Sequence, residues 1–65
     1  MDWHDYLCEE RKRKISTNDL MSSDRLTLSE LRNGVVTDTT AEMITANQKH
    51  IAEIEEILTS AGIHF

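Results

Sequence analysis

An all-α fold is the structure that this sequence predicts: a small bundle of three to four helices with a long C-terminal amphipathic helix. The chain has no proline and only two glycines, Gly34 and Gly62, so few residues interrupt a helix. Apolar residues recur at helical spacing near both ends of the chain. The length of 65 residues, 38% of them hydrophobic, allows one helical domain, residues 1–65, with a thin core.

The first helix is expected over residues 3–14. Trp3, Tyr6 and Leu7 recur at the spacing that places them on one helix face. Asp2 suits the N-cap, because its carboxylate can accept a hydrogen bond from a free backbone N–H. The last turn would hold a basic run, whose cations stabilise the negative end of the helix dipole: Arg11, Lys12, Arg13 and Lys14.

Two short helices are expected in the middle segment, residues 16–33. The first follows Ser16, where Ser-Thr-Asn-Asp is a run of side chains that favour helix caps. The second runs from Asp24 to Asn33. Gly34 would end it, because glycine adopts the left-handed conformation of the C′ position without a steric penalty.

The long C-terminal helix is expected over residues 39–61. Thr39 and Glu42 have capping-box spacing, and Gly62 would end the helix. A heptad seam predicts a homodimer interface formed by Ile44, Asn47, Ile51, Ile54 and Leu58. The same seam is also typical of an ordinary core, and a thin core favours both uses at once. Asn47 could fix the register of a helix pair or mark the edge of the seam.

The net charge of −5 is unevenly distributed along the chain. Residues 1–10 carry −4, residues 11–36 carry +3 and residues 37–65 carry −4. The basic middle could contact a phosphate backbone, or it could pair with the acidic ends of the same chain.

No enzyme is expected, and neither a metal nor a cofactor. Cys8 and the three histidines show no pair at zinc-ligand spacing, and neither glycine belongs to a phosphate-binding loop. The sequence lacks a run of about 18 apolar residues, and its first residues do not resemble a signal peptide. We therefore expect a cytoplasmic protein that engages no membrane and no small-molecule substrate.

Residues 27–34, Thr-Leu-Ser-Glu-Leu-Arg-Asn-Gly, resemble the recognition helix of the lambda-repressor/Cro-like (Xre-type) helix-turn-helix DNA-binding family. In that family a Ser-x-apolar-x-Asn-Gly ending closes the helix that lies in the DNA major groove. Residues 51–65 are similar to the closing helix of small members, which ends in an Ala-Gly-apolar-x-Phe tail.

This resemblance implies a helix-turn-helix within residues 16–33, with base-edge contacts near the start of its second helix and phosphate contacts around it. The implied DNA-binding residues are Arg11, Lys12, Arg13, Lys14, Arg25, Thr27, Ser29 and Arg32. A second alignment treats Leu26 to Asn33 as the scaffold helix and the segment after Thr39 as the reading helix.

Two functions follow as expectations. The first is a small sequence-specific DNA-binding transcriptional regulator of phage or mobile-element type, acting as a dimer. The alternative is an acidic helical protein-interaction factor, an inhibitor or anti-defence protein of phage type, which binds a protein target and not DNA. The basic middle favours the regulator, whereas the pI of about 5.0 favours the protein-binding factor.

Overall fold

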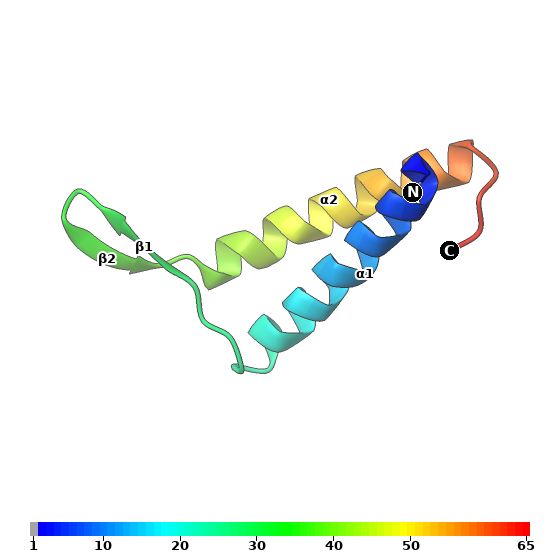
Figure 1. Ribbon diagram of the computed structural model, residues 1–65. Helices are drawn as coiled ribbons and strands as arrows, with labels where there is room; N and C mark the ends of the chain where they lie inside the picture. The colour runs from blue at the N-terminus through cyan, green and yellow to red at the C-terminus, as the bar shows by residue number, and fades with distance from the viewer. Residues whose placement is uncertain (1) are drawn as a thin grey trace.

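The computed structural model describes residues 2–65 and has the element order α-β-β-α. The elements are α1 (Trp3–Ser22), β1 (Ser29–Arg32), β2 (Val35–Asp38) and α2 (Thr40–Ser60). The two helices lie side by side and antiparallel, and the β-hairpin extends beyond the end of the helix pair that is remote from both termini (Figure 1). The prediction of a bundle of three to four helices is therefore wrong.

Helix α1 is longer than the expected helix 3–14 because its polar residues find partners within the helix and on α2. The Thr17 hydroxyl donates a hydrogen bond of 2.9 Å to the Arg13 carbonyl, four residues earlier. The Asn18 amide is directed instead to the Ile44 carbonyl of α2, at 3.2 Å. Neither side chain acts as a cap, so the helix continues through the predicted break.

The helix predicted over residues 24–33 does not form. Asn33 and Gly34 have φ values of 50° and 79°, the pair of positive values that a type I′ turn requires. This turn joins two strands whose register pairs Arg32 with Val35. The Asn-Gly dipeptide, interpreted as a helix end, is a hairpin turn, and the helix-turn-helix of residues 16–33 is absent.

Helix α2 begins one residue later and ends one residue earlier than the expected helix 39–61. Gly62, with φ of 73°, ends it as predicted. The N–H of Gly62 reaches the Thr59 carbonyl at 3.0 Å, and the next N–H reaches the Leu58 carbonyl at 2.9 Å, the two bonds of a Schellman motif. The predicted capping box is wrong, because Thr39 makes no side-chain cap bond and the Glu42 carboxylate binds Arg32.

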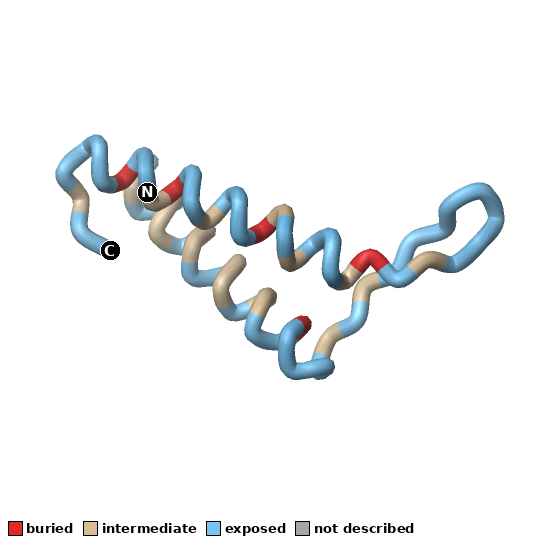
Figure 2. Tube along the Cα trace, turned by 180° about the vertical axis from the view of Figure 1, so that it is seen from behind, coloured by how far each residue is buried: buried red, intermediate tan, exposed pale blue. Residues whose placement is uncertain are grey.

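The core lies between the two helices and is small. Its buried apolar side chains are Met21, Ile54 and Leu58, and Leu58 is fully buried. Figure 2 shows buried positions along the side of α2 that faces α1. Neither described helix has the length and apolar character needed to cross a membrane.

Candidate functional site

The β-hairpin is the least covered part of the fold. Leu31, Val35 and Val36 leave 71%, 63% and 74% of their surfaces exposed. The sheet has two strands, so within residues 2–65 each strand has one neighbour and one free edge. Exposed apolar side chains beside free backbone groups are the features by which one chain recruits a strand from another.

One face of the hairpin points away from the helices. Leu31 and Val36 are paired across the strands and therefore share a face. Arg32 lies on the opposite face, because successive residues of a strand point to opposite sides. Since Arg32 reaches Glu42 in the first turn of α2, the face of Leu31 and Val36 is turned towards solvent.

Hydrogen bonds fasten the base of the hairpin to the start of α2. The Leu28 N–H donates to the Thr40 hydroxyl at 2.9 Å, and the Thr39 N–H donates to the Leu28 carbonyl at 2.9 Å. Hydrogen bonding from Thr40, first through its side chain and then through its backbone N–H at 2.9 Å, lowers the pKa of the Asp38 carboxylate. These bonds orient the base of the hairpin relative to α2.

Arg32 braces the inner face of the hairpin. Its guanidinium donates two hydrogen bonds to the Glu42 carboxylate, at 2.6 and 3.2 Å, and a further one to Glu30. These bonds raise the pKa of Arg32 and lower that of Glu42. All three side chains are about half exposed to water, so the network orients the hairpin more than it stabilises the fold.

The predicted phosphate-binding run, residues 11–14, lies in the middle of α1 and not in its last turn. Arg11 donates a hydrogen bond of 2.9 Å to Glu55 of α2, and its guanidinium stacks 4.6 Å from the ring centre of Phe65. Arg13 binds Glu10 at 2.6 Å. Two of the four cations are therefore neutralised within the chain, as the alternative interpretation of the basic middle anticipated.

The other predicted DNA-binding residues do not share a helix. Arg25 and Thr27 lie in the connection between α1 and β1, whereas Ser29 and Arg32 lie in β1. No helix within residues 2–65 presents these residues to a major groove. The structure thus places the eight predicted residues on three separate segments.

The predicted dimer seam faces α1 of the same chain. Ile54, Leu58 and Asn47 are buried there, and Ile44 and Ile51 are half-buried. The Asn47 side-chain amide donates a hydrogen bond of 3.0 Å to the side-chain oxygen Oδ1 of Asn18, so the polar position of the seam pairs with a polar position of α1. The structure uses this seam within the monomer.

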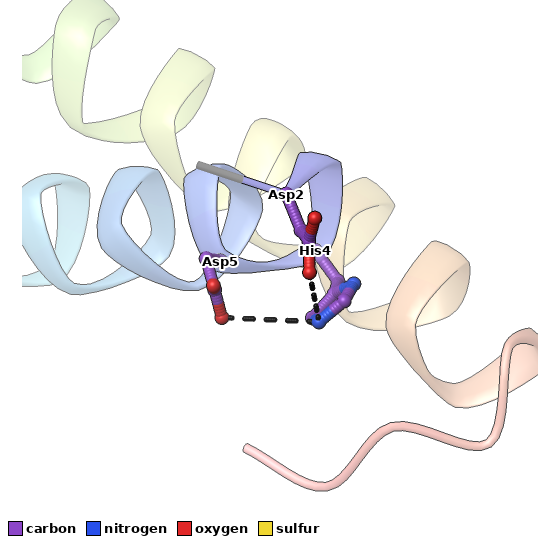
Figure 3. A group of neighbouring side chains, drawn as sticks. All are labelled: Asp2, His4 and Asp5. Carbon is purple, nitrogen blue, oxygen red and sulfur yellow. Dashed lines mark ion pairs between the residues drawn. The ribbon is translucent and has the colours of Figure 1, made fainter.

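A group of possible metal ligands lies at the start of α1. Asp2, His4 and Asp5 offer ligand atoms within 4.8 Å of one another. Both carboxylates are directed towards the imidazole, at 3.7 and 3.8 Å from its Nε2 atom (Figure 3). The carboxylate side chains are 74% and 63% exposed, and three ligands fall short of the closed four-ligand sphere of a structural zinc site.

The exposed hairpin residues Leu31, Val35 and Val36 are not among the residues that the sequence predicted for a functional site. The signal was present, because Asn33-Gly34 between short runs containing apolar residues is the strongest local indication of a two-residue hairpin.

No protein-family model matches the sequence, and comparisons with curated proteins and with solved structures gave no significant match.

Proposed function

We propose that this chain is a small non-catalytic protein-binding factor, and that its β-hairpin docks on a partner protein that supplies a further strand. The observation that carries the proposal is the uncovered hairpin, whose apolar face has Leu31 71% and Val36 74% exposed. A partner with a free strand edge beside an apolar groove fits the free edges and the apolar face of the hairpin. Backbone pairing along the edge provides affinity, and the groove takes the apolar side chains.

The small size of the two-stranded sheet supports a partner that supplies a strand. A sheet of two strands, each of four residues, is marginal in water, and a third strand normally makes such a sheet stable. The hairpin is held at its base, through Leu28 and Thr40, and not along its outer face. Docking therefore adds a strand to a structure that is already oriented, which limits the entropy lost on binding.

The charges of the chain favour a protein partner over DNA. The hairpin itself, Ser29–Asp38, carries two acids and one base, and that base is engaged by Glu30 and Glu42. A net charge of −5 disfavours the counterion release that drives binding to DNA. The factor would act in the cytoplasm, where the single Cys8 stays reduced.

The test is site-specific photo-crosslinking in cells that produce the protein naturally. A photoreactive residue replaces Val36 in one variant and Gln48, an exposed residue of α2, in the control. We expect a defined protein adduct at position 36 that is absent at position 48. The purified partner should then bind wild-type protein and the shape-matched Val36→Thr variant at least about tenfold more tightly than Val36→Asp.

Three results would contradict the proposal: equal adducts at both positions, no protein adduct at position 36, or an adduct with nucleic acid. A parallel measurement addresses DNA directly. Fluorescence anisotropy with duplex DNA at about 50 mM salt should show no binding, whereas salt-dependent binding would restore the regulator hypothesis.

A further inference from the structure

A second, partly exposed surface runs along α1, on the side next to the face that packs against α2. Its residues are separated by alternating steps of three and four, the heptad spacing of a helix that packs along another helix. We call it the outer stripe, and it consists of Trp3, Tyr6, Glu10, Arg13, Thr17 and Leu20.

The outer stripe is distinct from the packed face of α1. The packed face includes buried Met21 and half-buried Leu7 and Ile15. On the outer stripe, by contrast, Trp3 and Tyr6 are each 55% exposed and Leu20 is 42% exposed. Both aromatic side chains of α1 are therefore more than half exposed, although aromatic side chains bring more apolar area to an interface than other side chains do.

The order of residues along the outer stripe is self-complementary. About the midpoint between residues 11 and 12, the apolar Trp3 corresponds to Leu20, and acidic Glu10 corresponds to basic Arg13. Two such stripes placed antiparallel would set each Glu10 opposite the Arg13 of the other copy, and each Trp3 opposite a Leu20. A two-fold symmetric interface requires this matching of a surface with itself.

Neighbouring residues of α2 extend the surface. Tyr6 and Ile57 line one shallow hollow between the helices, and Ile57 is 48% exposed. Both helices therefore carry an exposed apolar side chain beside this hollow. Acidic Glu10 and Glu53 follow along the same hollow, with basic Lys14 beyond them.

We propose that two copies of the chain pair through their outer stripes, with the α1 helices antiparallel at the centre of the dimer. This pairing covers Trp3 and Tyr6 and places Arg13, which already binds Glu10 of its own chain, between two carboxylates. It also supplies extra burial. Residues 2–65 bury three apolar side chains, and a chain of fewer than about 70 residues rarely gains enough stability from a single core of that size. The interface differs from both the hairpin and the α2 seam, so this proposal does not depend on the proposed function.

Charge reversal tests the pairing without removing apolar contacts. Glu10→Lys places two cations opposite each other in the symmetric dimer, and Arg13→Glu places two carboxylates there. Each variant alone should lose dimer affinity by at least about tenfold in sedimentation equilibrium. An equimolar mixture of the two should recover a heterodimer, because the lysine introduced at position 10 of one chain then meets the glutamate introduced at position 13 of the other. The second contact of that heterodimer joins the unaltered Arg13 of the first chain to the unaltered Glu10 of the second.

The controls separate pairing from folding. Far-ultraviolet circular dichroism should show that both variants keep their helices, and Val36→Asp in the hairpin should leave the dimer intact. Tyr6→Asp should also give a monomer. The proposal is overturned if wild-type protein is monomeric at about 100 µM, if the mixture stays monomeric, or if Val36→Asp dissociates the dimer while the charge variants do not.

Discussion

Replacing one member of the Asn18–Asn47 pair should cost more stability than replacing both. Asn47 is 6% exposed and donates a hydrogen bond of 3.0 Å to Asn18, which itself donates to the Ile44 carbonyl. Asn18→Leu leaves the buried Asn47 amide without its acceptor, and an orphaned buried donor costs about 1–3 kcal/mol. Asn47→Leu orphans only the oxygen of Asn18, which is half-buried, so its cost should lie near the lower end of that range.

The double variant provides the decisive comparison. With leucine at both positions no amide is left unpaired, so Asn18→Leu/Asn47→Leu should lie within about 1 kcal/mol of wild type or above it. The measurement is urea unfolding followed by far-ultraviolet circular dichroism, repeated at several protein concentrations because self-association adds to stability. This role of the asparagine pair is contradicted if the single replacements change the free energy of unfolding by less than about 0.5 kcal/mol, or if their effects simply add in the double variant.

Three further predictions concern the core, the turn and the corner between the hairpin and α2. Leu58→Ala should destabilise the fold by about 2–5 kcal/mol, whereas Ile57→Ala, truncating a side chain that is 48% exposed, should cost much less; equal losses in urea unfolding would contradict the placement of the core. Gly34→Ala should cost about 1 kcal/mol, because φ is 79° there, and the broadening of hairpin amide signals in NMR spectra checks it. Arg32 lowers the pKa of Glu42, so their pairing stabilises the folded state above about pH 4.5, and this stabilisation is lost as the pH falls through the lower folded pKa. NMR titration of the Glu42 carboxyl should give a lower pKa in wild-type protein than in the Arg32→Gln control.

Long-range periodicity predicted α2 well, because that helix carries several independent signals. Its apolar seam persists over nearly its whole length, and Gly62 ends it with the hydrogen bonds of a Schellman motif. Two residues of that seam, Ile54 and Leu58, are buried in the core. What periodicity could not decide is which helix they pack against, since the same stripe suits a second copy and α1 equally.

The middle of the chain was predicted wrongly because one local pattern fits two structures. Asn-Gly after a leucine-containing segment suits a helix C-terminus, and it suits a type I′ turn equally well. The tertiary fold decides between them: Leu28 and Thr39 are bonded to each other across the base of the hairpin, a contact that no short sequence window contains. The same limit applies to α1, where Asn18 belongs in a helix only because α2 offers it a partner.

Together, the two proposals predict a bivalent molecule. If α1 helices pair antiparallel, the two hairpins point away from opposite ends of the dimer, because each hairpin extends beyond one end of its own helix pair (Figure 1). A dimer would then hold a partner at both ends, and binding to a surface carrying many partner molecules would gain from effective concentration.

This arrangement separates the two surfaces experimentally. Tyr6→Asp should weaken binding to a densely immobilised partner by about 10²-fold or more, yet leave the affinity for a dilute monovalent partner unchanged. Val36→Asp should weaken both. If Tyr6→Asp reduces the monovalent affinity as well, the outer stripe contacts the partner directly, and the hairpin is not the sole docking element.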